Sequence, residues 1–172
     1  MEKNNTILIV DYGSQYTQLI ARRVRELKVH SLILPYDFNP NDIKKYNVKG
    51  FILSGGPSSV YDKNSPLLPK GIFDYNIPIL GVCYGFQLLV KYFKGNVESS
   101  NHAEYGRSKI KISNPGNLFK DIKKSTNVWM SHGDKVTKIP DQWKVTSKSE
   151  NNVISSSENS SLNLFGVQFH PE

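Results

Sequence analysis

Four short segments in the first half of the chain are rich in apolar residues and are predicted to be strands. They are residues 6–10, 29–34, 49–53 and 77–82. Strands that are apolar on both faces are typical of a parallel sheet that helices cover from both sides. Segments with helical character separate or follow them, at residues 15–28, 41–46 and 84–94. The alternation predicts an α/β fold with an open, mostly parallel, doubly wound sheet and helices on both faces.

The second half of the chain has a different pattern of apolar and polar residues. Residues 108–112 alternate between apolar and polar, and further short strands are predicted at 127–130, 135–139, 143–146, 153–155 and 162–169. No convincing helix interrupts them, so this half is expected to extend the sheet with antiparallel strands. The Ser/Asn-rich residues 155–161 are predicted to form an exposed hairpin tip.

Bulk properties exclude several classes of protein. A chain of 172 residues with 38% hydrophobic residues fits one domain with a real core. No apolar run approaches the roughly 18 residues of a membrane helix, and one cysteine cannot form an internal disulfide, so a cytoplasmic protein is expected. The net charge is +7, but the lysines are scattered and form no nucleic-acid motif. We therefore predict neither a membrane nor a nucleic-acid partner.

The single cysteine, Cys83, lies between a predicted strand and a predicted helix, with Gly81 and Gly85 beside it. Such glycines allow a sharp strand-to-helix turn that exposes a nucleophile. Unpaired N–H groups at the start of the helix favour a thiolate and a developing oxyanion. A buried structural cysteine is the competing interpretation, because free cysteine is among the most buried residue types.

A glycine-rich turn, residues 54–57 (Ser-Gly-Gly-Pro), follows the strand predicted at 49–53. Ligands of open α/β sheets bind beyond the carboxyl ends of the strands, so this turn is expected near Cys83. We predict an oxyanion hole made by the backbone N–H groups of Gly56 and Tyr84. An ordinary turn is the alternative interpretation of this segment.

A thiol nucleophile also needs a base and a group that orients the base. His30, at a strand start, is predicted to be structural, and His102 falls in a predicted polar loop. His170 follows the last predicted strand and precedes Glu172 by two positions. Alternate residues of an extended chain point to the same side, so His170 and Glu172 can form a base and its orienting carboxylate.

Together these motifs resemble those of the class I (triad) glutamine amidotransferases. The matching segments are residues 54–57, 81–87 (Gly-Val-Cys-Tyr-Gly-Phe-Gln) and 166–172 (Gly-Val-Gln-Phe-His-Pro-Glu). Residues 11–16, 59–62, 104–106 and 129–136 are also similar to the amidotransferase domains of GMP synthases. The resemblance extends over residues 7–172 and implies a flavodoxin-like sheet. Phe86 and Phe165 replace a common methionine and a frequent tyrosine, which are apolar exchanges.

The resemblance implies a role for each matching residue. Cys83 would attack the carboxamide of glutamine and form a γ-glutamyl thioester, His170 would shuttle protons, and Glu172 would orient His170. The glutamine-binding residues that it implies are Gly55, Gly56, Gln87, Ser131, His132 and Gly133. His132 is expected in the pocket rather than as the base, and a purely loop-ordering role is weighed equally. No metal site is predicted.

The resemblance also implies a partner. Ammonia would pass to an ATP-pyrophosphatase (synthetase) domain or subunit, where ATP and Mg²⁺ serve the conversion of XMP to GMP. The chain contains no Ser-Gly-Gly-Val-Asp-Ser type pyrophosphate loop, so no cofactor is expected in it. Residues 1–172 are expected to be one amidotransferase domain, truncated after His-Pro-Glu. The alternatives are a catalytically silent fragment that acts as a binding module, and a related hydrolase of γ-glutamyl or peptide bonds.

Overall fold

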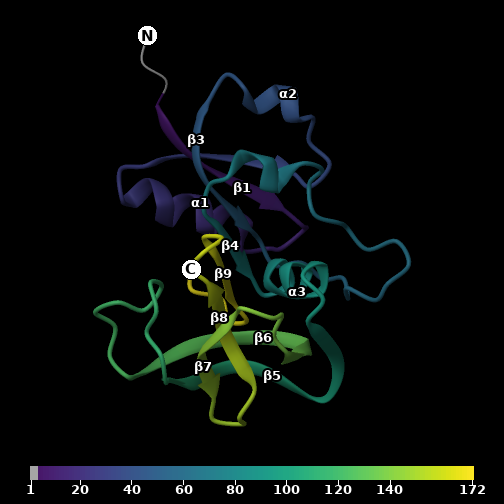
Figure 1. Cartoon of the computed structure of the whole chain (residues 1–172), viewed down its shortest axis with the longest axis vertical. Helices are drawn as coiled ribbons and strands as arrows, with labels where there is room; N and C mark the ends of the chain where they lie inside the picture. Colours follow the sequence, from purple (N-terminus) through teal and green to yellow (C-terminus); the bar gives the residue numbers. More distant parts are fainter. Residues whose placement is uncertain (1–3) are drawn as a thin grey trace.

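One nine-stranded sheet organises the computed structural model, which describes residues 4–172 except the side chains of residues 100–102 (Figure 1). Its strands are β1 (Asn5–Asp11), β2 (His30–Pro35), β3 (Asn47–Leu53), β4 (Ile79–Val82), β5 (Asn96–Ile112), β6 (Ser125–Lys138), β7 (Lys144–Ser149), β8 (Ile154–Asn159) and β9 (Leu164–Val167). Their order is β2-β1-β3-β4-β9-β8-β7-β5-β6. Strands β2, β1, β3, β4 and β9 are parallel, and the others pair antiparallel. The predicted parallel sheet with an antiparallel extension is confirmed.

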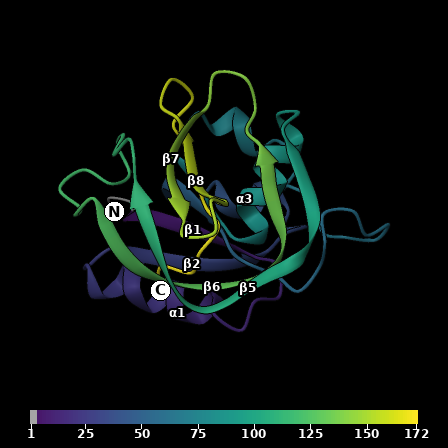
Figure 2. The ribbon, with the colours of Figure 1, turned by 90° about the horizontal axis from the view of Figure 1, so that it is seen from below.

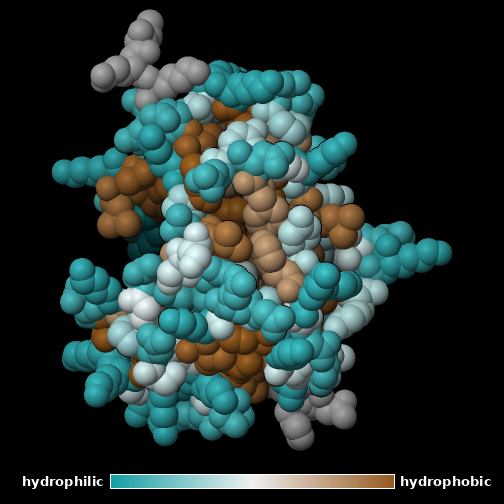
Figure 3. All heavy atoms as spheres, viewed as in Figure 1, coloured by the Kyte–Doolittle hydropathy of each residue, from teal (hydrophilic) through white to brown (hydrophobic). Residues whose placement is uncertain are grey.

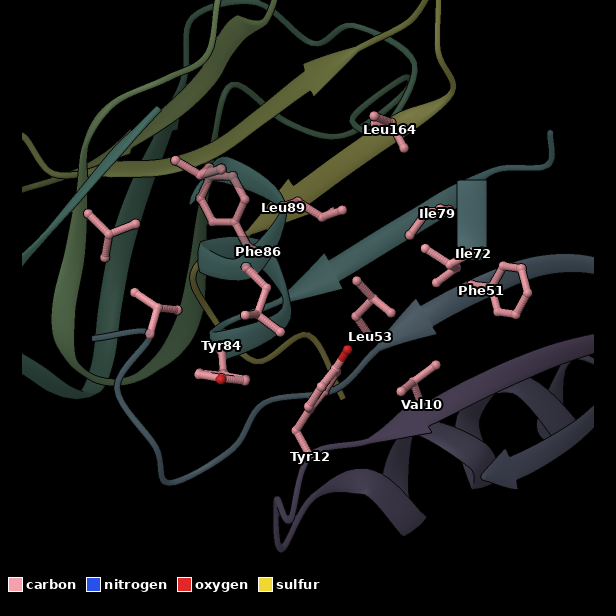
Figure 4. Packing of buried hydrophobic residues seen from close by; sticks show 14 of the residues in the cluster. Val10, Tyr12, Phe51, Leu53, Ile72, Ile79, Tyr84, Phe86, Leu89 and Leu164 are labelled. Atoms are coloured by element: carbon pink, nitrogen blue, oxygen red, sulfur yellow. The ribbon is translucent and has the colours of Figure 1, made fainter. Parts of the chain in front are cut away.

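Helices lie on both faces of the parallel strands, as predicted (Figure 1). They are α1 (Thr17–Glu26), α2 (Pro40–Ile43), the 3-10 helix η1 (Ile72–Tyr75) and α3 (Tyr84–Tyr92). On one face, Ile20 and Ala21 of α1 pack against Ile9 of β1. On the other face, Phe86 of α3 joins Leu53 in the main core (Figure 4). Successive residues of a strand point to opposite faces, so continuously apolar strands supply both cores.

Two long strands, β5 and β6, form a curved ribbon along the end of the molecule that Figure 2 views. Residues 127–130 and 135–139, predicted as separate strands, belong almost entirely to the single strand β6, and β5 extends far beyond the predicted residues 108–112. The polar residues Ser131 to Asp134 between the two predicted strands are part of β6. They pair with Tyr105, Glu104 and Ser99 of β5, and this pairing positions them beside the end of β4.

The predicted exposed hairpin tip at residues 155–161 is wrong. Most of this segment belongs to β8, which lies between β7 and β9, and Ser155 and Ser156 are fully buried. Their hydroxyl groups hydrogen-bond inside the sheet, Ser156 to Thr146 at 2.5 Å and Ser155 to Ser147 at 2.6 Å. Paired hydroxyls can be buried at little cost, so polarity alone does not indicate exposure here.

None of the described helices is long and apolar enough to cross a bilayer. On the face that Figure 3 shows, hydrophilic side chains surround separate apolar patches.

Close packing of Phe86 on Gly166 gives a first testable prediction. A Cβ atom at Gly166 would overlap the ring of Phe86, which is fully buried. The exchange Gly166→Ala should therefore lower the free energy of unfolding by about 1–3 kcal/mol, as overpacking does. Urea unfolding measures it, with Gly133→Ala as the control, because the nearest atom to a Cβ there is 4.0 Å away. Equal losses in the two variants would contradict this packing argument.

Candidate active site

Cys83 occupies a sharp turn between β4 and α3. Its backbone has φ 49° and ψ −105°, a region that residues other than glycine rarely adopt. The N–H of Cys83 donates to the carbonyl of Val167 at 2.8 Å, and the N–H of Gly85 donates to that of Ser54 at 3.1 Å. A Cβ at Gly81 would lie 2.6 Å from the carbonyl carbon of Gly85. The flanking glycines thus let β4 and α3 approach closely enough to hold the cysteine in this conformation.

His170 and Glu172 lie beside this turn, at the carboxyl end of β9. The Nδ1 atom of His170 is 2.9 Å from Oε1 of Glu172, and the side chain of Cys83 is near enough to raise the pKa of the ring. The backbone N–H of His170 donates to the carbonyl of Trp129 at 2.9 Å, which fixes the segment against β6. Both side chains are buried. The structure therefore brings the three predicted catalytic side chains together.

Burial and hydrogen bonding shift the pKa of His170 in opposite directions. Burial lowers the pKa of the imidazole, because it disfavours the charged ring. The hydrogen bonds to Cys83 and Glu172, together with the negative charges of these groups, outweigh burial and raise the pKa to about 9. At neutral pH the site therefore favours a protonated ring between two partners that can carry negative charge, as in other Cys–His sites.

His170 should therefore keep its ring proton until a pH of about 9, instead of the ordinary 6.5. A pKa that is higher in the folded protein adds stability that is complete below pH 6.5 and is lost as the pH rises through about 9. NMR titration of the ring C–H signals measures the midpoint. Unfolding of the wild type and of His170→Gln at low and high pH measures the stability. A ring midpoint near 6.5 would contradict this arrangement.

Two cavities open onto Cys83. One, of about 360 Å³, is lined by Gly56, Pro57, Ser58, Ser59, Cys83, Tyr84, Gln87, Tyr105, Ser131, His132, Gly133 and Asp134. The other, of about 350 Å³, is lined by Gly13, Ser14, Gln15, Tyr16, Gly56, Pro57, Cys83, Ser131 and His170. A larger apolar groove of about 630 Å³ is also lined in part by His170, but Cys83 is not among its lining residues. Cys83 thus lines both of the first two cavities, with His132 in one and His170 in the other.

Most predicted glutamine-binding residues line the first cavity, and Gly55 is the exception. A Cβ at Gly55 would lie 2.9 Å from Cε1 of His170, so this glycine makes room for the imidazole. Gly56 lines both cavities, and a Cβ there would lie 2.6 Å from the carbonyl oxygen of Tyr12. Tyr84 begins α3, so its N–H is among those without an intrahelical acceptor. The oxyanion hole at Gly56 and Tyr84 stays a prediction that this placement suits.

His132 lines the first cavity, but protein groups occupy both of its ring nitrogens. Nε2 is 3.1 Å from Oε2 of Glu104, and Nδ1 is 2.9 Å from the carbonyl oxygen of Asp134. Burial lowers the pKa of the ring, which is 5% exposed, although Asp134 and Glu104 oppose this. The Glu104 carboxylate is itself buried and accepts hydrogen bonds from Ser149 and Asn151. His132 thus orders β6 and also borders the cavity.

Sequence reasoning missed two side chains that contact the predicted triad. The ring of Tyr16 lies 5.0 Å from that of His170, centroid to centroid. The side-chain nitrogen of Gln168 lies 3.6 Å from Sγ of Cys83. Gln168 precedes His170 by two positions, so the same alternation that paired His170 with Glu172 was a signal for it. The prediction that His102 falls in a polar loop is wrong, because its backbone belongs to β5, which pairs with β6; its side chain lies outside the described residues.

Within the part of the chain that the structure describes, no three His, Cys, Asp or Glu side chains are grouped to hold a metal ion.

Comparisons with known proteins give a consistent result. Residues 8–172 match the family model "Glutamine amidotransferase class-I". A glutamine-hydrolysing GMP synthase of Petrotoga mobilis is 53% identical over the whole chain, and that of Oceanobacillus iheyensis is 48% identical. The chain spans about a third of the length of these relatives, 33% and 34%.

Solved structures agree with this match. A protein of Thermoplasma acidophilum, described as one subunit of a GMP synthase, is 29% identical, with a TM-score of 0.89 over 99% of this chain and 86% of that one. A glutamine amidotransferase of Thermotoga maritima, 18% identical, shares the fold with a TM-score of 0.76 over 98% of this chain and 76% of that one.

Proposed function

We propose that this chain, which belongs to the class I glutamine amidotransferase family, hydrolyses the side-chain amide of glutamine. The observation that carries the proposal is the grouping of Cys83, His170 and Glu172 beside a cavity that Cys83 and His170 line. A thiol on a strained turn, a histidine beside it and a carboxylate behind the histidine are the parts that nucleophilic acyl transfer needs.

The reaction would proceed in two halves. The thiolate of Cys83 attacks the amide carbon of glutamine, and the N–H groups of Gly56 and Tyr84 stabilise the oxyanion. His170 then gives its ring proton to the nitrogen as the C–N bond breaks, which releases ammonia and leaves a γ-glutamyl thioester. In the second half, the oxygen of a water molecule attacks the thioester while His170 takes a proton from that water. Glutamate leaves, and the thiolate and the protonated ring are restored.

The first cavity would hold the amino-acid end of glutamine. It is lined by Ser131 to Asp134 of β6 and by Gln87 of α3. The amide nitrogen of Gln87 already donates to the carbonyl of Asp134 at 3.1 Å. Gln87 would therefore act mainly by fixing this wall, and backbone groups of β6 would contact the substrate.

The ammonia would serve GMP synthesis. This proposal is supported by the relatives, which are named GMP synthases and are about three times as long as the part that the chain matches. The remaining length would supply the ATP-pyrophosphatase (synthetase) region, which uses ATP and Mg²⁺ to convert XMP to GMP. Glutamine would be the substrate of this chain, and the cytoplasm its compartment.

Glutamate release by the purified chain tests the proposal. We expect hydrolysis of glutamine, and a higher rate when a GMP synthase ATP-pyrophosphatase domain is added with ATP, Mg²⁺ and XMP. Folded protein that releases no glutamate in either setting would favour a silent binding module. Faster cleavage of γ-glutamyl peptides than of glutamine would favour the related hydrolase. Either result would overturn the proposal.

A further inference from the structure

A buried amide contacts the sulfur of Cys83 and has no part in the reaction described above. We propose that Gln168 is a further catalytic residue, whose side-chain N–H donates a hydrogen bond to Sγ of Cys83 and stabilises the thiolate before attack. The role in catalysis rests on the proposed glutaminase function, whereas the contact with the sulfur does not.

The placement of Gln168 is closely defined. Its Nε2 lies 3.6 Å from Sγ of Cys83, within the longer range of hydrogen bonds to sulfur, and the residue is fully buried. Its backbone N–H donates to the carbonyl of Ser155 at 2.8 Å, so β8 holds the chain at this point. A buried amide must find partners for its donors, and the cysteine sulfur is the partner available on this side.

A chain of hydrogen bonds fixes which end of the amide faces the sulfur. The carbonyl oxygen of Asp134 can only accept, so the atom of Gln87 that lies 3.1 Å from it must be the NH₂ group. The same NH₂ group lies 3.2 Å from the amide of Gln168, which must present its oxygen there. The NH₂ group of Gln168 is therefore turned toward Cys83. If Gln168 were flipped, two donors would face each other.

The sulfur needs such a donor because one of its other neighbours is an acceptor. The carbonyl oxygen of Ser131 lies 3.6 Å from Sγ and can accept the S–H of the thiol form. That contact favours the thiol over the thiolate. His170 and Gln168 are the two groups that donate to the thiolate, and Gln168 does so without changing its charge.

Other titratable side chains lie around the sulfur, and a test must compare proteins in which these side chains are the same. They are His170 and Glu172 after β9, His132 and Asp134 in β6, Tyr105 in β5, Tyr84 in α3 and Tyr16 ahead of α1. Variants at Gln168 leave all of these side chains in place.

The chain has one cysteine, so its alkylation by iodoacetamide reports on Cys83 alone. Gln168→Met keeps the length of the side chain and removes the donor, and Gln168→Glu keeps its shape and presents a carboxylate. Each should slow alkylation at pH 7 by about tenfold, which is the loss expected for a hydrogen bond to a charged group. The rates should recover at high pH, where the thiolate is fully formed. Gln18→Met, on the exposed side of α1, is the control and should match the wild type.

A second measurement needs no variant of Gln168. In ¹⁵N-labelled wild-type protein, the side-chain NH₂ signal of Gln168 should shift as Cys83 titrates. In Cys83→Ala that pH-dependent shift should be absent. In the glutaminase assay, both Gln168 variants should lower kcat by about tenfold and leave KM nearly unchanged, because the hydrogen bond acts on the nucleophile.

The inference would be overturned if folded Gln168 variants had the same alkylation profiles as the wild type. It would also be overturned if the NH₂ signal of Gln168 had the same pH dependence in the wild type and in Cys83→Ala. Gln168 would then be a packing residue only. If the profiles shift but the wild type releases no glutamate, the contact stands and the proposed function fails. The two claims are thus separable.

Discussion

Replacing Cys83 with alanine or serine should abolish glutamine hydrolysis, with a loss of kcat on the order of 10⁴ or more, as for other nucleophile deletions. The chain has no second thiol that could take over the reaction. The hydroxyl of serine remains protonated beside His170 and is a far weaker nucleophile at neutral pH. Glutamate release under saturating glutamine measures the loss.

A third exchange at this position separates activity from folding. Cys83 has φ 49°, where glycine is not strained and other residues are. Cys83→Gly should therefore unfold at the same urea concentration as the wild type or a higher one, although it is inactive. Residual glutamate release above a hundredth of the wild-type rate in any of the three variants, from protein freed of contaminating glutaminase, would contradict the assignment of the nucleophile.

Exchanges of His170 and Glu172 should produce the second-largest effect. His170→Gln removes the group that protonates the leaving ammonia, and general acid–base catalysis of this kind contributes roughly 10²- to 10⁴-fold. Glu172→Gln keeps an oxygen that can accept from Nδ1 but removes the negative charge. The corresponding exchange in a serine triad costs about 10⁴-fold in kcat, so we expect a loss within the same range of about 10²- to 10⁴-fold. Glu172→Gln should also lower the pKa of His170 from its value of about 9. The ratio kcat/KM for each variant measures both losses.

The double variant shows whether the two residues act as one unit. If Glu172 works by orienting His170, then His170→Gln combined with Glu172→Gln should be no less active than His170→Gln alone. Losses that multiply in the double variant would indicate that Glu172 acts on the substrate by a separate route.

The main features of the fold follow from local sequence patterns. The apolar runs before Asp11, Ser54 and Cys83 are typical of strands buried in a parallel sheet, and the structure has them there. The turn at Cys83 follows from its two glycines, and the pairing of His170 with Glu172 follows from the alternation of an extended chain. These are short-range properties that neighbouring residues determine.

The features that sequence reasoning missed depend on long-range pairing. The hydroxyls of Ser155 and Ser156 are buried because β7 supplies partners for them. Gln168 meets Gln87, 81 positions earlier in the chain, and only the fold brings their amides together. Glu104 likewise finds its partner in His132 across the pairing of β5 and β6. A polar residue becomes part of a site when tertiary structure supplies its partner, and no local pattern contains that partner.

Covalent trapping during turnover tests the central claim most directly. The purified chain is mixed with isotopically labelled glutamine and quenched in acid, and its peptides are analysed by mass spectrometry. We expect a γ-glutamyl group on the peptide that contains Cys83, its removal by hydroxylamine, and its absence from Cys83→Ala. Glutamate release without any label on Cys83, or with the label on another residue, would contradict the account.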